Sequence, residues 1–320
     1  MKLIVQIPCF NEEKSLPITL RDIPRVLKGI DKIEILVIDD GSTDKTVEVA
    51  KREGVDHIVK LTNHKGLAES FNTGIDASLR LGADIIVNTD GDNQYKGKDI
   101  QKLIDPILSG EADIVIGDRN INEIKHFSFV KKQLQGFGSW VVRQLSGTRI
   151  PDVTSGFRAF SRDAALRLNI VSRFTYTLET VIQAGKKNIA LSHVPIETNE
   201  QLRPSRLFSS IPSYLKRSIA TIARVYALYE PLKIFLIIGG SIFGAGFLVS
   251  VRFLYYYITQ QGAGHVQSLI FSAILMIVGF QIVMIGLLAD IIGANRKFLE
   301  DILYRVKKLE LSSRKKDEGK

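Results

Sequence analysis

The chain has 320 residues, of which 45% are apolar, a formal net charge of +9 and a single cysteine, Cys9. One cysteine excludes an internal disulfide, and the length is ample for a buried core with further segments beside it. The positive charge predicts an anionic partner, such as nucleic acid, an acidic membrane surface or a phosphorylated small molecule. Much of that charge lies toward the C-terminus and no nucleic-acid-binding motif accompanies it, so we expect no nucleic-acid partner.

Short apolar runs alternate with polar segments of helical period over the first 200 residues. This alternation predicts βαβ units and a doubly wound, mainly parallel α/β sheet. Because the runs are apolar throughout, we expect helices to cover both faces of the sheet. Gln6 and Pro8 interrupt the N-terminal run, so we expect a strand there and no signal peptide. The expected strands are residues 2–7, 33–39, 56–61, 83–89 and 112–118.

Two much longer apolar stretches follow, residues 234–251 and 268–289. Each approaches the roughly 20 residues that a helix needs to cross a bilayer, and neither has a polar face, which favours membrane spans over core helices. Residues 207–233 mix Leu, Ile and Tyr with basic residues, which fits an amphipathic helix on an anionic leaflet or a surface helix packed on the domain. We therefore expect a catalytic-looking domain (1–206), a juxtamembrane segment (207–233), a two-helix hairpin (234–289) and a basic tail (290–320).

The charges around the hairpin predict its orientation. The linker between the spans holds no Lys or Arg, whereas the tail beyond Asn295 is rich in both. The positive-inside rule then places both termini and the N-terminal domain in the cytoplasm, on a multi-pass protein of the cell membrane. Gly240 and Gly244 have small-xxx-small spacing, which predicts packing against the second span or against another copy of the chain, and so permits a homo-oligomer.

Acidic side chains follow the expected strands. Asp39 and Asp40 follow the second strand, Asp90 and Asp92 the fourth, and Asp118 the fifth. Ligands of doubly wound sheets gather at the carboxyl ends of the strands, so we expect these acids to converge on one crevice. Adjacent residues at a strand end point to opposite faces, which would let either Asp39 or Asp40 meet a ligand while the other braces the loop.

The stretch NTDGDNQY (88–95) is a candidate metal site. If residues 90–94 remain extended, Asp90, Asp92 and Gln94 point the same way and offer oxygens to one hard cation, Mg²⁺ or Mn²⁺. Such a cation prefers few carboxylates together with waters and a substrate's phosphates. The alternative interpretation is a solvated Asp-Gly turn.

Five stretches together resemble the family-2 glycosyltransferases with a GT-A fold: IPCFNEEKSL (7–16), VIDDGSTDKT (37–46), HKGLAESFNTGI (64–75), NTDGDNQY (88–95) and TSGFRAFSR (154–162). Within that family the pattern is most similar to the polyprenyl-phosphate glycosyltransferases, the dolichyl-phosphate mannose synthase and bactoprenol glucosyltransferase type. The resemblance covers about residues 1–225, and the pair of spans is similar to one branch of the group. It implies inverting, metal-dependent transfer of a sugar from a UDP- or GDP-sugar, with UDP slightly favoured, to dolichyl or undecaprenyl phosphate.

The resemblance also implies roles for individual residues. The metal would be bound by Asp90, Asp92 and Gln94. The acceptor's phosphate would meet Arg119, Lys131 and Gln135, although the last two stand where the subgroup often has Arg and Ser. The residues expected to act in catalysis are Asp92, Arg119 and Arg206, the last of them near the donor diphosphate. The nucleotide sugar would contact Pro8, Phe10, Glu12, Asp39, Asp40, Asp90 and Asp92.

Two other functions fit a similar domain. A processive polysaccharide synthase usually carries a QxxRW motif, whereas the only tryptophan here, Trp140, lacks that context. A non-catalytic membrane protein that binds a nucleotide sugar would tolerate loss of the metal acids, which this sequence retains.

Overall fold

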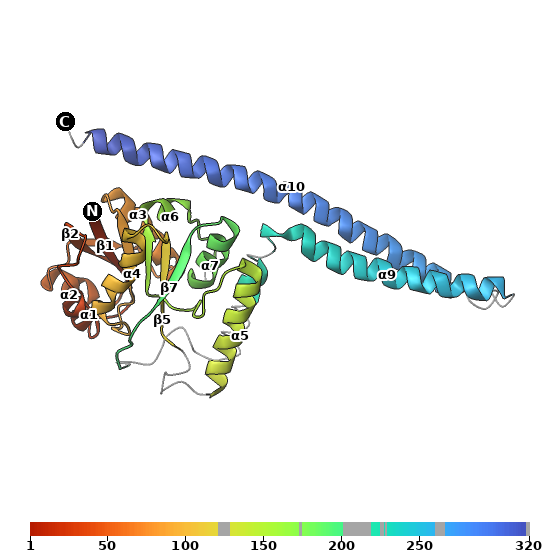
Figure 1. The fold of residues 1–320 in the computed structure, drawn as a ribbon, viewed down its shortest axis with the longest axis horizontal. Helices are drawn as coiled ribbons and strands as arrows, with labels where there is room; N and C mark the ends of the chain where they lie inside the picture. The colour runs from red at the N-terminus through yellow and green to blue at the C-terminus, as the bar shows by residue number, and fades with distance from the viewer. Residues whose placement is uncertain are drawn as a thin grey trace. The chain divides into compact units, whose positions relative to one another are not determined.

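The computed structural model describes residues 1–120, 129–172, 175–200, 219–224, 227, 229–259 and 266–317 (Figure 1). Contacts divide the chain into two compact units. The first, which we call the catalytic unit, comprises residues 1–222 together with 303–320, and the second, the hairpin unit, comprises residues 223–302.

A seven-stranded sheet forms the centre of the catalytic unit, in the order β3-β2-β1-β4-β6-β5-β7. Neighbouring strands are parallel except that β6 runs antiparallel to both β4 and β5. The five predicted strands are confirmed, as is the mainly parallel sheet, while β6 and β7 were not predicted. The strands are β1 (Lys2–Cys9), β2 (Lys32–Asp39), β3 (His57–Lys60), β4 (Ile85–Asn88), β5 (Ile114–Asp118), β6 (Arg158–Ser161) and β7 (Leu191–Pro195).

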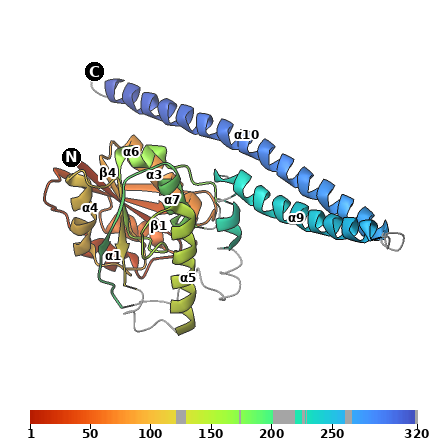
Figure 2. The same cartoon turned by 45° about the vertical axis from the view of Figure 1, so that its right-hand side comes forward.

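Helices cover both faces of this sheet, as its apolar strands predict. Helices α1 (Leu16–Asp22), α2 (Thr46–Arg52) and α4 (Ile100–Leu108) lie on one face, and α3 (Leu67–Arg80) and α6 (Arg162–Arg167) on the other (Figure 2). A short 3-10 turn, η1 (Gly97–Asp99), precedes α4, and α5 (Phe129–Ser146) packs against α7 (Thr177–Lys186).

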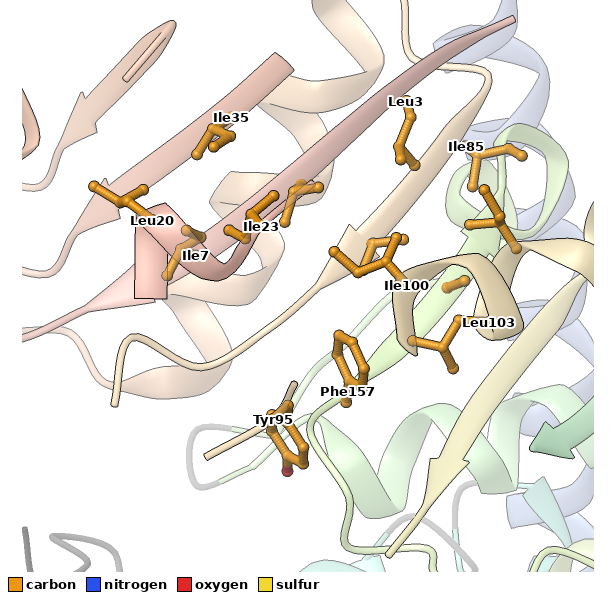
Figure 3. Close-up of a cluster of buried hydrophobic side chains, with 14 of the residues drawn as sticks. Leu3, Ile7, Leu20, Ile23, Ile35, Ile85, Tyr95, Ile100, Leu103 and Phe157 are labelled. Carbon is orange, nitrogen blue, oxygen red and sulfur yellow. The ribbon is translucent and has the colours of Figure 1, made fainter. Parts of the chain in front are cut away.

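The core follows the two-residue period of the strands. Leu3 and Ile7 of β1 point to the same face and meet Leu20 of α1 and Leu103 of α4 in one buried cluster (Figure 3). The pairing register places Cys9 opposite Asp39, and Gln6 opposite Asn88. The parallel strands therefore end together, and we call this side of the sheet, where β1 to β5 finish, the carboxyl edge.

The hairpin unit contains α9 (Pro231–Ile258) and the part of α10 (Val266–Asp317) that precedes residue 303. Both helices are long and apolar enough to cross a membrane, and each contains an 18-residue stretch with a mean hydropathy of 2.3 in α9 and 2.5 in α10. They contain the predicted spans, but α10 continues as helix through the predicted tail as far as Asp317. Of the predicted juxtamembrane segment, 207–218 lies outside the described residues, and 219–224 is helical.

Glycines pack the two helices of the hairpin closely. A Cβ at Gly239 would lie 2.7 Å from the carbonyl oxygen of Gly279, and one at Gly246 would lie 2.9 Å from Cβ of Leu275. A Cβ added at Gly240 or Gly244, by contrast, would meet no atom of another described segment within 4 Å. The prediction that these two pack against the second span is wrong, because the helical turn points them to another face. Their contact with a second copy stays a prediction.

Candidate active site

Asp39 and Asp40 divide their roles at the end of β2. Asp40 accepts the backbone N–H groups of Lys65 (2.7 Å) and Gly66 (2.9 Å) and lies 2.8 Å from Nδ1 of His64. The carboxylate of Asp39 accepts the backbone N–H of Ser42 through Oδ1 at 3.1 Å. Its other oxygen, Oδ2, is buried and has no hydrogen-bond partner in the described part of the chain. The expected division is confirmed for Asp40, which braces the loop, and contact of Asp39 with a ligand stays a prediction.

The loop after β1 lies beside these two acids. Pro8 is the penultimate residue of β1 and pairs in register with Ile38. Phe10 stacks on the ring of His64, with centroids 4.0 Å apart. Glu12 is buried, donates its backbone N–H to Thr46 Oγ1 at 2.8 Å, and accepts the hydroxyl of Ser15. The residues predicted to surround the base therefore gather at the carboxyl edge.

The candidate metal stretch folds differently from expectation. Residues 91–92 form a turn and Asn93 takes the left-handed region with φ 56°. Asp92 accepts the backbone N–H of Gln94 at 3.2 Å, an Asx-type bond that such a turn favours. The extended arrangement of Asp90, Asp92 and Gln94 was therefore a wrong prediction, because asparagine tolerates the left-handed conformation that reverses the chain here.

Close backbone approaches bring this turn onto the other acids. A Cβ at Gly91 would lie 3.0 Å from Sγ of Cys9 and 3.3 Å from Cγ of Glu12. Burial raises the pKa of the Cys9 thiol, and the negative charges of Glu12, Asp39 and Asp90 raise it further. Glu12, Asp39 and Asp90 thus lie around the end of β1, and for Asp39 and Asp90 this agrees with the prediction that the acids at the strand ends converge.

The carboxylate of Asp90 lies against Gly156. A Cβ at Gly156 would lie 2.9 Å from Asp90 Oδ2 and 3.1 Å from the hydroxyl of Tyr176. The backbone N–H of Gly156 donates to the Tyr95 hydroxyl at 2.9 Å, and Asn88 donates to its carbonyl at 2.9 Å. Burial raises the pKa of both tyrosines, and Asp90 adds to each rise, so the two hydroxyls stay protonated. Only glycine leaves room for Asp90 at this point.

The residues predicted to bind a metal carry oxygen donors, the type that a hard divalent cation prefers. In the residues that the structure describes, no three His, Cys, Asp or Glu side chains form a group that could hold a metal. Asp90, Asp92 and Gln94 offer two carboxylates and a carboxamide, and their binding of one metal ion stays a prediction. Mg²⁺ and Mn²⁺ accept such a set when substrate phosphates and water complete it.

Arg119 follows β5 at the same edge and is buried in an ion pair. Its Nε and Nη2 donate to the two carboxylate oxygens of Asp152 at 2.6 and 3.0 Å, and Nη2 also donates to Thr154 at 2.8 Å. Burial alone would lower the pKa of Arg119, but Asp152 outweighs it and raises the pKa. Asp90 also contributes to that rise, so the charges of Asp90 and Arg119 act on each other. The guanidinium stays cationic and fixed in orientation.

Arg158 of the stretch TSGFRAFSR is fully buried and holds the loop before β6. Its Nε donates to the Ser155 carbonyl and its Nη2 to the Val153 carbonyl, both at 2.8 Å, and Nη1 bonds to Thr180. Burial lowers its pKa to about 10. These bonds fix the segment that carries both Gly156 and the partner of Arg119.

For three predicted site residues the structure does not describe the side chain. Lys131 and Gln135 belong to α5, but their side chains lie outside the described residues, as does the whole of Arg206. Their roles stay predictions.

Sequence reasoning missed several residues that the site uses. Asp152 and Gly156 lie far along the chain from Arg119 and Asp90, and no local pattern connects them. Asn88 could have been found from the sequence, because it is a polar residue at the end of an apolar strand. Gln6 is likewise a polar residue within an apolar strand, and in the structure it pairs in register with Asn88 and donates a hydrogen bond to it at 2.9 Å. Buried polar side chains inside strands need partners, so this pair marked a polar network beside the crevice.

Comparison with known proteins identifies the family. A model of glycosyl transferase family 2 matches residues 4–168, more than half of the 320-residue chain. The chain belongs to this family. As a family-2 glycosyltransferase it is an enzyme, and a second model, the GtrB C-terminal hairpin, matches residues 230–294 of the same chain.

Individual relatives agree with this assignment. The chain is 30% identical over 213 residues to the UDP-N-acetylglucosamine–dolichyl-phosphate N-acetylglucosaminyltransferase of Methanococcus voltae, which covers 60% of this chain and 83% of the relative. It is 26% identical over 221 residues to the polyprenol monophosphomannose synthase of Mycolicibacterium smegmatis, covering 65% of this chain and 82% of the relative.

Solved structures share the fold of the catalytic unit. One is the glucosyl-3-phosphoglycerate synthase of Mycobacterium tuberculosis, crystallised with Mn²⁺, UDP-glucose and phosphoglyceric acid. Its TM-score is 0.57 at 21% identity, and the match covers 71% of this chain and 80% of that one. The likeness supports the GT-A architecture.

Proposed function

We propose that this family-2 glycosyltransferase transfers a sugar from a UDP- or GDP-sugar to a membrane polyprenyl phosphate. The observation that carries the proposal is the attachment of two membrane-length helices, α9 and α10, to a glycosyltransferase domain. A polyprenyl phosphate keeps its chain in the bilayer and its phosphate at the interface, so the enzyme must work at that surface. The names of the Methanococcus and Mycolicibacterium relatives, which act on dolichyl phosphate or make a polyprenol monophosphomannose, support the same acceptor class.

The unpartnered oxygen of Asp39 supports a nucleotide donor. A buried carboxylate oxygen without a hydrogen bond is costly, and a ligand N–H group placed there would satisfy it. Uracil and guanine each present a ring N–H, whereas cytosine and adenine present an unprotonated ring nitrogen at the corresponding position. This favours UDP- and GDP-sugars, and of the two we favour UDP.

The reaction is an inverting displacement. An oxygen of the acceptor's phosphate attacks the anomeric carbon from the face opposite the nucleoside diphosphate; the new carbon–oxygen bond forms as the bond to the diphosphate breaks. The attacking oxygen is already ionised near neutral pH, so no strong general base is needed. Arg119, held rigidly by Asp152, would orient that phosphate, and Lys131 and Gln135 would assist it.

Negative charge accumulates on the departing diphosphate and must be neutralised. Asp90, Asp92 and Gln94 would hold Mg²⁺ or Mn²⁺, which when bound supplies Lewis-acid stabilisation of that charge. Arg206 would add a second positive charge beside the diphosphate. The basic residues beyond Asn295 favour a cytoplasmic catalytic unit and cytoplasmic termini.

Transfer of label from donor to lipid tests the proposal. Purified protein in detergent is mixed with radiolabelled UDP- or GDP-sugars, a polyprenyl phosphate, and Mg²⁺, Mn²⁺ or a chelator. We expect label in the organic phase only when both the lipid phosphate and a divalent metal are present. Label in a water-soluble polymer would favour a polysaccharide synthase instead, and nucleotide-sugar binding without any transfer would favour a non-catalytic binding protein.

A further inference from the structure

The ring of His64 lies at the nucleotide end of the site and has no role in the chemistry described above. His64 belongs to the loop between β3 and α3, whereas the ring that it stacks on, Phe10, follows β1. The two centroids lie 4.0 Å apart and the planes meet at 26°. An offset pair at this distance is a specific contact, made by residues 54 positions apart in sequence.

Asp40 fixes the orientation of this imidazole. Its carboxylate lies 2.8 Å from Nδ1 of His64 and is only 3% exposed. Because Asp40 also accepts the N–H groups of Lys65 and Gly66, ring and backbone are held by one buried group. A carboxylate can only accept, so Nδ1 carries the proton and the ring presents its Nε2 edge.

The turn after β2 fits closely beneath the same loop. Gly41 has φ 72°, and a Cβ there would lie 2.7 Å from the carbonyl carbon of Asn63 and 2.7 Å from the nitrogen of His64. Any side chain at Gly41 would displace the backbone that carries His64. The loop is therefore held from both sides: Asp40 bonds it, and Gly41 lets it approach.

The neighbouring carboxylate shows where a base would sit. Asp39 directly precedes Asp40 and holds the buried oxygen without a partner, which the proposed function assigns to a base N–H. Because Asp39 and Asp40 are consecutive, we expect a base bonded at that oxygen to lie at the end of β2, near the loop that Asp40 anchors. The ring pair is the aromatic surface at this end of the site, and aromatic side chains bind bases through their faces.

We propose that His64 is a nucleobase-binding residue, forming with Phe10 the aromatic wall of the donor pocket. This inference rests on the proposed function. It attributes the affinity for the base to stacking on the ring of His64, and it does not require a charge on the imidazole. A planar ring at position 64 would preserve the wall, and a small side chain would remove it.

Equilibrium binding of UDP and of GDP to full-length protein, measured by calorimetry with Mg²⁺, tests the inference. We expect His64→Ala to weaken binding of the preferred nucleotide about tenfold, and His64→Phe to stay within about threefold of the native chain. The matched control is His57→Ala, because His57 pairs with Glu34 at the start of β3, away from the carboxyl edge, and should bind normally. In turnover, His64→Ala should raise KM for the nucleotide sugar and leave kcat nearly unchanged.

Each outcome has a defined meaning. Native-like binding by His64→Ala would overturn the inference while leaving the proposed function intact. Equal losses in His64→Ala and His64→Phe would also overturn it, because the ring would not be what matters. If the native chain bound neither nucleotide, the proposed function would fail and this inference with it. Thermal unfolding of each variant checks that position 64 does not act through stability.

Discussion

The two ends of β2 treat buried charge in opposite ways. At its amino end Glu34 is only 8% exposed by its side chain and pairs with Lys2, Lys32 and His57 at 2.7 to 2.8 Å. At its carboxyl end Asp39 is fully buried and leaves one oxygen without a partner in the described part of the chain. Satisfied charge contributes to stability, whereas unsatisfied buried charge lowers it and persists where a ligand supplies the missing bond. The difference indicates which edge of the sheet serves binding.

The ion pair of Arg119 and Asp152 allows a test of whether buried charge at the carboxyl edge also stabilises the fold. Because both are buried, Asp152→Ala leaves an unpaired guanidinium, and we expect a loss of about 3–5 kcal/mol in the free energy of unfolding. Urea unfolding followed by circular dichroism measures it. As control, Arg21→Ala breaks an exposed pair with Glu53 and should cost about 1 kcal/mol or less. A small loss in Asp152→Ala would mean that Arg119 does not depend on its partner.

Asp92→Asn tests the edge for catalysis. Removing one electrostatic contact of this kind costs about 3 to 4 kcal/mol in the transition state, so turnover should fall by a factor of hundreds while the fold is retained. The label-transfer assay measures turnover. Asp105→Asn makes the same change on the exposed surface of α4 and should behave as the native enzyme. Near-normal turnover in Asp92→Asn would refute the metal assignment.

Asp39→Asn should separate binding from stability. The amide replaces an acceptor by a donor, so affinity for UDP or GDP should fall about 10- to 100-fold. Unlike Asp152→Ala, this change removes a buried charge that has an unpartnered oxygen, and the free energy of unfolding should not fall. Calorimetric binding and urea unfolding of the same preparation measure both. A destabilised Asp39→Asn variant with native affinity would show that Asp39 stabilises the fold and does not bind the nucleotide.

Glu34→Gln tests the amino end, where the smallest effect is expected. Burial alone would raise the pKa of Glu34, but its bonds to Lys2, Lys32 and His57 lower it to about 2 from the ordinary 4.5. A depressed folded-state pKa gives stability that is fully present above about pH 4.5 and is lost as the pH falls toward 2. Unfolding of the variant should therefore vary less with pH in this window, with turnover at neutral pH unchanged. Equal pH profiles would show that the cluster adds nothing.

The sequence predicted the elements of this fold where a signal was local. The runs at 2–7 and 33–39 are long, apolar and rich in β-branched residues, and each is a strand. The run RAFS in β6 is only four residues long, and LSHVP in β7 mixes polar and apolar residues, so tertiary pairing decides their conformation. The glycines that pack the two helices of the hairpin were likewise not predicted. Gly239 and Gly240 are adjacent in sequence, and only the direction in which each faces decides which of them contacts the other helix.

The site shows the same limit. Placement of Asp39, Asp40 and Asp90 at the carboxyl edge followed from their positions at the ends of predicted strands and is confirmed. The prediction that residues 90–94 are extended was wrong. The alternation of Asp90, Asp92 and Gln94 in the sequence does not indicate that Asn93 adopts the left-handed conformation. The pairing of Arg119 with Asp152 spans 33 residues and arises only when β6 inserts between β4 and β5.

The burial of Cys9 has a practical consequence for labelling. It is the only cysteine of the chain, is 2% exposed, and has a raised thiol pKa, so thiolate-directed maleimides should react with it slowly. Labelling of the native chain should therefore be low, so that the reaction of an introduced cysteine can be measured against it. Val26 is 87% exposed, and Val26→Cys would give one reactive thiol on the catalytic unit. In sealed vesicles of known orientation, its access to a membrane-impermeant reagent would report on which side of the bilayer this unit lies.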